Sequence, residues 1–321
     1  MMNSQQFAPA SPVVKEPHIP SISVGLPVHN GEKFVEDAIK AILSQTFKDF
    51  ELIISDNAST DRTWEICSRY AAMDERVRCY RNERNLGVAT NFNNTVRLAR
   101  GRYFRWAAYD DLMAPDLLGS CLTVLDREPD VVLCYPKTVN IDDDGNILFN
   151  YEDNFGFRSP NAHERFKDAM LALRDNECNA LYGVIRCDVL RKTSMIQDYH
   201  SADRVLLAEL TLHGQFYEVP ERLFFHRIHK NISTRPGMTA RGLAVWFNPS
   251  NRAKRTFPVF RRFVEFFKAV NRAPLSFYQR VYCYLQILRF YGSRDKWERL
   301  FRKVHSLLRK ERPVEITSPR P

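Results

Sequence analysis

Residues 21–63 read "SISVGLPVHNGEKFVEDAIKAILSQTFKDFELIISDNASTDRT" and decide the fold of this 321-residue chain. The segment 21–27 has the short apolar character of a strand, and 32–46 repeats apolar residues at helical spacing. Residues 50–56 form a nearly continuous apolar run, which is typical of a strand buried on both faces of a parallel sheet. The order strand, helix, strand predicts the first unit of an α/β sheet.

The same alternation continues along the chain. A helix is predicted over 61–74, a strand over 76–82, a helix over 88–100 and a strand over 102–108. We therefore expect an α/β fold with helices on both faces of the sheet. In such sheets ligands bind beyond the carboxyl ends of the strands.

Acidic residues stand at two of these strand ends. Asp110 and Asp111 follow the strand at 102–108, and Asp56 ends an earlier strand. Adjacent carboxylates are costly unless a positive charge lies between them, and hard divalent cations prefer oxygen ligands. The alternative is a helix N-terminus, where carboxylates are also favourable and where Pro115 would suit the first turn.

Beyond the acidic pair the pattern is less regular. The sequence predicts a strand over 130–142, a helix over 201–214 and two short strands on either side of Pro220. Residues 236–257 show no periodic pattern, whereas 258–310 are predicted to be helical.

Composition is typical of a soluble globular protein, with 44% hydrophobic and 26% charged residues. The net charge of +9 is unevenly spread, because residues 241–321 hold 19 Lys+Arg against 5 Asp+Glu. None of the seven cysteines forms a C-x-x-C motif, and no run reaches the roughly 18 apolar residues of a membrane span. These features predict a cytoplasmic protein, either free or held peripherally at the inner face of the cell membrane.

Six segments, in this order, resemble family 2 glycosyltransferases with the GT-A fold. They are 21–63, "NLGVATNFNNTVRLARG" from 85, "RWAAYDDLMAPD" from 105, "YGVIRCDVL" from 182, "SADRVLLAELTLHG" from 201 and "RIHKNIS" from 227. The resemblance covers about residues 20–235. It implies a mostly parallel, Rossmann-like sheet flanked by helices, and transfer of a sugar from a nucleotide diphosphate to an acceptor hydroxyl with inversion.

The resemblance also suggests a division of the chain. Residues 21–235 would form the catalytic domain, with a nucleotide-binding half over 21–115 and an acceptor half over 116–235. Residues 1–20 are expected to be a disordered lead-in, and 236–321 a basic, mainly helical extension.

Individual residues receive roles only through this resemblance. It implies that Asp203 is the catalytic general base. It implies nucleotide-sugar contacts by Pro27, Asp56, Asn85, Asp110, Asp111 and Arg227, and metal contacts by Asp110, Asp111 and His229. The metal would be Mn²⁺ or Mg²⁺, because oxygen coordination suits both ions.

Each role has a simpler alternative. Asp56 would accept the N3–H of a pyrimidine base, or it would only cap the following turn. Asp203 would take the proton of the acceptor hydroxyl, or it would only favour the first turn of its helix. His229 and Arg227 could instead be a structural side chain and a solvated charge. One departure stands out, because Ala108 occupies a position where the family often has a further Asp.

The resemblance leaves the donor as a UDP- or dTDP-linked sugar and the acceptor as a saccharide or a lipid-linked molecule. The basic C-terminal helices would either contact an anionic membrane or pack on the catalytic body. The alternative function is a non-catalytic protein that binds nucleotide sugars or nucleic acid on the same fold. Nucleic acid is the less favoured partner, because no recognition motif is present.

Overall fold

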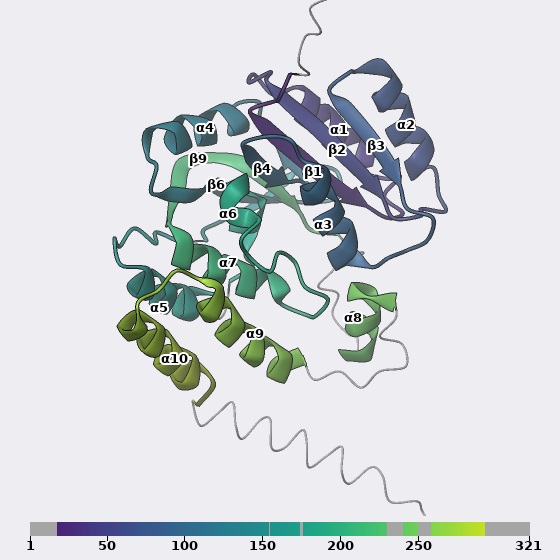
Figure 1. Cartoon of the computed structure of the whole chain (residues 1–321). Helices are drawn as coiled ribbons and strands as arrows, with labels where there is room; N and C mark the ends of the chain where they lie inside the picture. The colour runs from purple at the N-terminus through teal and green to yellow at the C-terminus, as the bar shows by residue number, and fades with distance from the viewer. Residues whose placement is uncertain (1–17, 154, 174–175, 230–239, 250–257, 293–321) are drawn as a thin grey trace, which may run out of the picture.

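The computed structural model describes residues 18–153, 155–173, 176–229, 240–249 and 258–292. In these segments one β-sheet is covered by helices on both faces, and further helices pack at one end (Figure 1). The strands are β1 (Ile22–Val28), β2 (Phe50–Asp56), β3 (Val77–Arg81), β4 (Tyr103–Trp106), β5 (Leu112–Met113), β6 (Val131–Ile141), β7 (Ile147–Tyr151), β8 (Val184–Arg186) and β9 (Gln215–Arg227).

The helices that precede β9 are α1 (Val35–Leu43), α2 (Thr63–Met73), α3 (Val88–Leu98), α4 (Leu117–Arg127), α5 (Ala162–Ala172), the short 3₁₀ helix η1 (Asn179–Tyr182), α6 (Cys187–Leu190) and α7 (Ala202–His213). Helices α1, α2, α3 and α7 begin close to where the periodicity places them, whereas no helix was predicted over the residues of α5. Three more follow near the C-terminal end: α8 (Ala240–Phe247), α9 (Pro258–Arg272) and α10 (Phe277–Gly292).

The strands pair in the order β3-β2-β1-β4-β8-β6-β9-β5, and β7 pairs with β6. Strands β3, β2, β1 and β4 are parallel, and every residue of β1 and β2 is buried. The predicted α/β architecture is therefore confirmed. In the second half β6 and β9 are parallel, while β8, β7 and β5 join in antiparallel directions.

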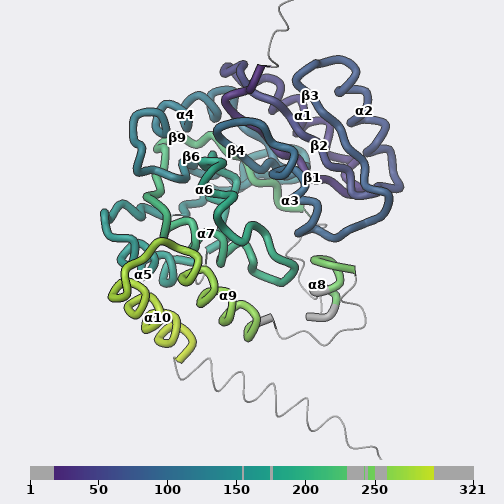
Figure 2. Tube along the Cα trace, viewed as in Figure 1, coloured from purple at the N-terminus to yellow at the C-terminus, as the bar shows by residue number. Residues whose placement is uncertain are grey.

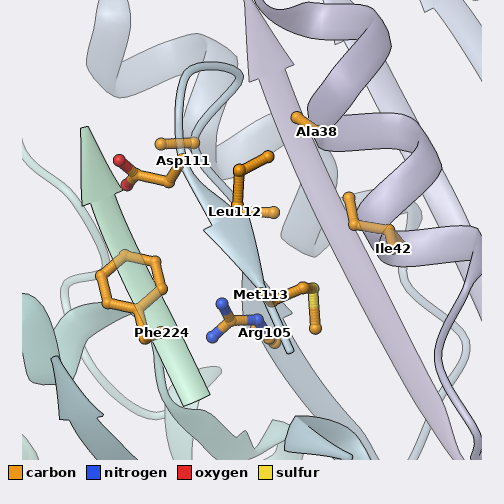
Figure 3. A pocket seen from close by; sticks show the side chains of 9 residues that line it. Ala38, Ile42, Arg105, Asp111, Leu112, Met113 and Phe224 are labelled. Carbon is orange, nitrogen blue, oxygen red and sulfur yellow. The ribbon is translucent and has the colours of Figure 1, made fainter. Parts of the chain in front are cut away.

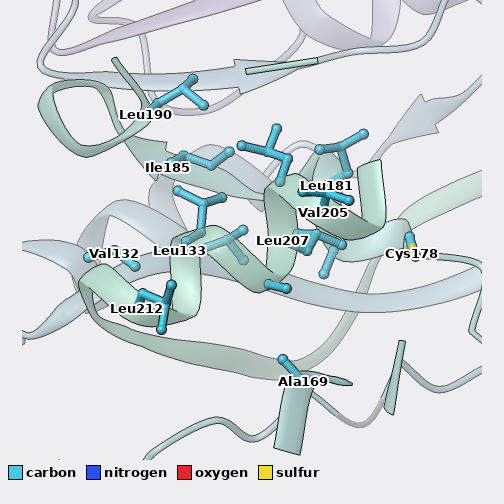
Figure 4. Close-up of a cluster of buried hydrophobic side chains, with 14 of the residues drawn as sticks. Val132, Leu133, Ala169, Cys178, Leu181, Ile185, Leu190, Val205, Leu207 and Leu212 are labelled. Carbon is cyan, nitrogen blue, oxygen red and sulfur yellow. The ribbon is translucent and has the colours of Figure 1, made fainter. Parts of the chain in front are cut away.

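Two hydrophobic cores lie on the two faces of the sheet. One is formed with α1, α2 and α4, and the other with α3, α5, α6, α7 and the last two helices. In the second core Val205 and Leu207 of α7 pack beside Leu133 and Ile185 of the sheet (Figure 4). Each fully buried Leu or Ile stabilises the fold by about 1.5–3 kcal/mol. Nearly all of α7 is buried, so its first turn has a fixed position at the edge of the sheet.

Strand β9 corrects one prediction. Instead of two short strands about Pro220, the structure has a single strand that runs through it. The pairing with β6 skips from Val219 to Arg222, so that Pro220 stands outside the ladder. Proline has no N–H to donate, and such an interruption lets a strand continue past it.

Helix α8 corrects a second prediction, because residues 236–257 were expected to be irregular throughout. Its sequence "ARGLAVWF" is short and contains a glycine, which disfavours a helix interior, so the local pattern gives only a weak helix signal. Its end lies against the start of α3. Gly87 has a φ of 83°, and a Cβ there would lie 2.3 Å from the carbonyl oxygen of Phe247. Only glycine fits this close approach.

Helices α9 and α10 confirm the helical prediction from 258 to 292, while residues 293–310 lie outside the described segments. Helix α9 packs on α7, and α10 packs on α5 and α9. Arg272 of α9 donates from Nε and Nη2 to the buried carboxylate of Glu209, at 2.7 and 3.0 Å. No helix in the described segments has both the length and the apolar composition needed to span a membrane.

Candidate active site

The acidic pair Asp110-Asp111 lies between the end of β4 and the start of β5. Strand β5 pairs with β9, and this pairing brings the end of β9 beside the acidic pair. Helix α4 begins only at Leu117, with Asp116 as its N-cap residue. The alternative in which the pair occupies a helix N-terminus is therefore wrong.

Asp111 is held by the end of β9. Its Oδ1 accepts a hydrogen bond from the backbone N–H of Arg227 at 2.9 Å and lies 3.1 Å from Nδ1 of His226. Its other oxygen, Oδ2, is buried and has no hydrogen-bond partner among the described residues. A buried carboxylate oxygen without a partner is unfavourable, and a cation would relieve this cost.

Asp110 contacts His229, the residue that the sequence placed with it as a metal ligand. Nε2 of His229 lies 2.9 Å from Oδ2 of Asp110, and the imidazole packs 4.9 Å from the ring of Phe34. Burial raises the pKa of Asp110. The negative charge of Asp111 raises it further, whereas the hydrogen bond with His229 lowers it. The structure thus brings Asp110, Asp111 and His229 together at one edge of the sheet.

These three residues do not form a complete ligand set. Within the described segments no three His, Cys, Asp or Glu side chains are arranged to hold one metal ion. His229 bonds to Asp110 instead of standing apart as a third ligand. Mg²⁺ is commonly held by only one or two carboxylates plus substrate phosphates. The two Asp side chains and the unpartnered Oδ2 of Asp111 fit that arrangement.

Arg227 is buried, which contradicts its alternative assignment as a solvated charge. The residue is 3% exposed, and its guanidinium lies 4.7 Å from the ring of Phe34. Nε donates to the carbonyl oxygen of Asp110 at 2.8 Å, and Nη1 donates to those of Asp142 and Asp143 at 3.0 and 2.6 Å. Arg227 therefore ties the acidic pair to the turn after β6.

His226 is a site residue that the sequence did not reveal. Burial alone would lower its pKa, but the Asp111 carboxylate outweighs burial and raises the pKa to about 9. His226 therefore places a positive charge beside the acidic pair at neutral pH. Its contact with Asp111 depends on the pairing of β5 with β9. No local pattern around His226 indicates that pairing.

Arg105 lies deeper, below the acidic pair, and was also missed. A small pocket beside Asp111 is lined by Arg105, Ala108, Met113 and Phe224, and Arg105 points toward the ring of Phe224 (Figure 3). Arg105 is 1% exposed, and its Nε and Nη1 have no partner among the described residues. Burial lowers its pKa to about 10, and Asp111 is among the charges that oppose this shift. Ala108, which stands where the family often has an Asp, lines the same pocket.

Asp56 ends β2, in the half of the chain that was predicted to bind the nucleotide. It is fully buried and accepts a hydrogen bond from the backbone N–H of Ser59 at 3.2 Å, while Nε of Arg81 lies 3.2 Å away. The expected turn-capping contact is therefore present. The hydroxyl of Ser59 also donates to Oδ1, and the N–H of Ser59 lies 3.4 Å from Oδ2, so each carboxylate oxygen already has two donors and a base N–H would have to replace one of them.

Pro27 and Asn85 flank Asp56. Pro27 is buried in β1 and pairs with Ser55, one residue before Asp56. Asn85 is exposed in the loop before α3. Its Oδ1 accepts hydrogen bonds from Nδ2 of Asn57 at 3.0 Å and from the N–H of Gly87 at 2.8 Å. Asn85 thus shapes the loop beside the predicted base site.

Asp203 lies in the first turn of α7 and is half-buried. Tyr182, at the end of η1, connects it with the acidic pair. The pKa of Tyr182 is raised well above its usual value, first by burial and then by the charges of Asp111, Asp110 and Asp203. The charges of the acidic pair and of Asp203 in α7 therefore act in the same direction on one buried side chain. Tyr182 also packs on Phe224, with their ring centroids 5.5 Å apart.

Three comparisons agree with this geometry. Residues 23–190, just over half of the chain, match the model of "Glycosyl transferase family 2". This match places the chain among the glycosyltransferases. The chain belongs to glycosyl transferase family 2, as its sequence predicted.

Proteins with similar sequences support the assignment to the glycosyltransferases. An uncharacterized glycosyltransferase of Haemophilus influenzae is 25% identical over 66% of this chain and 67% of its own length. The chondroitin synthase of Escherichia coli is 33% identical over 41% of this chain. The chain covers only 19% of that synthase.

Solved structures confirm the predicted GT-A fold. The S. aureus protein TarS (residues 1-349), in complex with UDP-GlcNAc, has a TM-score of 0.60 to this chain at 15% identity. The match covers 84% of this chain and 72% of that structure. At this level of identity the comparison shows a shared fold.

Proposed function

We propose that this glycosyltransferase transfers a sugar from a UDP- or dTDP-linked donor to a hydroxyl of a saccharide or lipid-linked acceptor, with inversion. The observation that carries the proposal is the placement of Asp110, Asp111 and His229 together at one edge of the sheet, with the buried Oδ2 of Asp111 left without a hydrogen-bond partner among the described residues. The UDP-GlcNAc complex of TarS supports a nucleotide-sugar donor, and the chondroitin synthase supports a saccharide acceptor. We also retain as a proposal the division into halves at 21–115 and 116–235, followed by an extension from 236.

The nucleotide would bind where β2 ends. Asp56 would accept the N3–H of a pyrimidine base, and charge assistance would strengthen that hydrogen bond. Pro27 and Asn85 would border the base on the strand and loop sides. Arg227 would act on the donor by fixing the backbone of Asp110, because its guanidinium donates to three carbonyl oxygens.

Asp110 and Asp111 would hold a divalent cation, Mn²⁺ or Mg²⁺, together with the donor phosphates. When bound, the cation would stabilise the negative charge that develops on the leaving diphosphate. His229 would orient Asp110 through the 2.9 Å contact, and His226 would orient Asp111.

Asp203 would be the general base. Its carboxylate would take the proton from the acceptor hydroxyl while that oxygen forms a bond to the anomeric carbon. The bond from this carbon to the phosphate oxygen would break on the opposite side, and the diphosphate would leave with the electron pair. The packing of α7 would hold Asp203 in place for this step.

The test uses the full chain with UDP-, dTDP- and GDP-sugars, each with and without Mn²⁺. Thermal shift would identify the donor, and release of nucleoside diphosphate in the presence of saccharide acceptors would measure turnover. We expect a pyrimidine donor to stabilise the protein only with metal, and turnover to be lost in Asp203→Asn. Donor binding without turnover for any acceptor would favour the non-catalytic alternative.

The nucleic-acid alternative receives no support from the basic residues of α9. Arg261 pairs with Asp198 at 2.5 Å, Lys268 pairs with Glu265, and Arg272 pairs with Glu209. These cations are engaged within the protein instead of forming an open basic groove. Salt-sensitive binding to duplex DNA would nevertheless overturn this conclusion.

A further inference from the structure

Helix α10 carries a stripe of exposed apolar side chains. Phe277, Val281, Leu285 and Leu288 follow one another at helical spacing and are 84%, 38%, 57% and 50% exposed. Tyr278, beside the first of them, is 68% exposed. We call these five residues the α10 stripe. Contiguous apolar side chains of this size are rarely left in water unless they meet a partner.

The opposite face of α10 is firmly packed. Cys283, Ile287 and Tyr291 are buried in the core that α10 shares with α7 and α9. The hydroxyl of Tyr291 accepts a hydrogen bond from Nε of Arg262 at 3.0 Å. The helix lies at the outer end of the molecule, beyond α5 and α9 (Figure 2). The α10 stripe is therefore held outward by a packed inner face.

The charges around the stripe favour one kind of partner. Helix α10 contains two arginines and no acidic residue, and Arg289 is exposed. The sequence that follows, 293–312, holds eight Lys+Arg against three Asp+Glu. In α9, by contrast, Arg261, Lys268 and Arg272 form ion pairs within the protein. The sequence therefore concentrates an excess of positive charge in α10 and the residues after it.

We propose that the α10 stripe docks on the anionic surface of a lipid bilayer. Apolar side chains flanked by basic residues are the features by which helices bind such surfaces, and each basic residue near the surface adds to the attraction. A second copy of this chain is a poorer partner, because pairing two stripes would bring two excess positive charges together. The inference stands independently of the proposed reaction.

The test is sedimentation of the full chain with lipid vesicles. One set contains phosphatidylcholine alone, and the other contains about one-third phosphatidylglycerol. The test variant is Phe277→Ser with Leu285→Ser. The matched control is Ile147→Ser with Phe149→Ser, which removes two exposed apolar side chains from β7. Circular dichroism and size-exclusion chromatography establish that each variant is folded.

We expect the wild type to bind anionic vesicles, to bind neutral vesicles weakly, and to be released by high salt. The stripe variant should bind at least about tenfold more weakly, and the β7 control should bind like the wild type. Three outcomes would overturn the proposal. They are no binding by the wild type, equal binding by the stripe variant, or a wild-type dimer that the stripe variant converts to a monomer without lipid. The last result would assign the stripe to contact between copies.

Discussion

Asp111 and Arg227 are 116 positions apart in the sequence, yet Oδ1 of Asp111 accepts a hydrogen bond from the backbone N–H of Arg227 at 2.9 Å. This contact makes the loop after β4 and the end of β9 one structural unit. It occupies one oxygen of the carboxylate, and within the part of the chain that the structure describes Oδ2 has no hydrogen-bond partner. The geometry of the acidic pair therefore depends on β9 as much as on the strand that precedes it.

Substitution Asp111→Asn separates the charge of this side chain from its shape. The amide oxygen can still accept from the N–H of Arg227, so the loop should stay in place. The variant lacks the negative charge that a cation requires. We expect UDP binding to lose its dependence on Mn²⁺ while the unfolding midpoint changes little, as measured by calorimetry with and without metal.

Asp144→Asn is the matched control, because it neutralises an exposed carboxyl in the turn after β6. It should bind UDP and Mn²⁺ like the wild type. Unchanged metal dependence in Asp111→Asn would show that this residue is not a metal ligand.

Substitution Asp203→Asn tests the general base. Removing a base typically lowers turnover by about 10²–10⁴, and an amide cannot accept the proton in its place. We expect kcat to fall by this factor while donor binding is unchanged, because the nucleotide would bind at β2 and not at α7. Steady-state kinetics combined with calorimetry of UDP binding would measure both quantities.

Asp188→Asn, on the surface of α6, provides the comparison for Asp203. Its kcat should equal that of the wild type. Full activity in Asp203→Asn would assign the base to another residue near Tyr182.

The sequence was sufficient for the features that depend on local patterns. Apolar periodicity predicted β1, α1, β2 and the elements up to β4, because each is amphipathic or continuously apolar over its own length. Adjacent acidic residues after a strand indicated a site at the sheet edge, since the topology places all such strand ends together. Helix α8 was missed because it is short and contains Gly242, and glycine is a poor helix former.

Other parts of the site depend on contacts between distant segments. The positions of His226 and Tyr182 follow from the pairing of β5 with β9 and from the placement of η1. The position of Arg105 in β4 gives no local signal, and only the packing shows that it is buried with Nε and Nη1 lacking hydrogen-bond partners among the described residues. Arginine is usually exposed to solvent, but Arg227 is buried, because its guanidinium donates hydrogen bonds to three backbone carbonyl oxygens.

Substitution Arg272→Met tests how α9 is attached to the catalytic body. Glu209 is fully buried, and the variant would leave its carboxylate without the two N–H donors of Arg272. Breaking such a pair typically costs about 3–5 kcal/mol. We expect the free energy of unfolding to fall by about 3 kcal/mol. This is the lower end of the typical range, because 32% of the Arg272 side chain is exposed to solvent.

Urea unfolding would measure this loss. The double variant Arg272→Met with Glu209→Gln should regain part of it, because a neutral amide is less costly to bury than a carboxylate. A double variant as unstable as the single one would show that the ion pair is not the cause.

Asp153 gives the protein a pH-dependent stability. The residue is 4% exposed, and burial, followed by the charge of Glu218, raises its pKa from 3.8 to about 7. In the unfolded chain Asp153 has its ordinary pKa of 3.8. At a pH between 3.8 and about 7 the carboxyl is therefore protonated in the folded protein and ionised in the unfolded chain. The free energy of unfolding therefore falls as the pH rises from about 4 to about 7. Above about pH 7 the carboxylate is charged in both states, and the destabilisation by its burial is then complete.

Asp153→Asn removes the titrating group. The variant should be about as stable as the wild type near pH 3, and more stable at about pH 8 by roughly 2–4 kcal/mol. Urea unfolding over this range would measure the difference. Asp37→Asn, which changes an exposed residue of α1, should leave the wild-type pH profile unaltered. A constant difference between Asp153→Asn and the wild type at every pH would contradict the raised pKa, because only a group that titrates within this range makes the difference depend on pH.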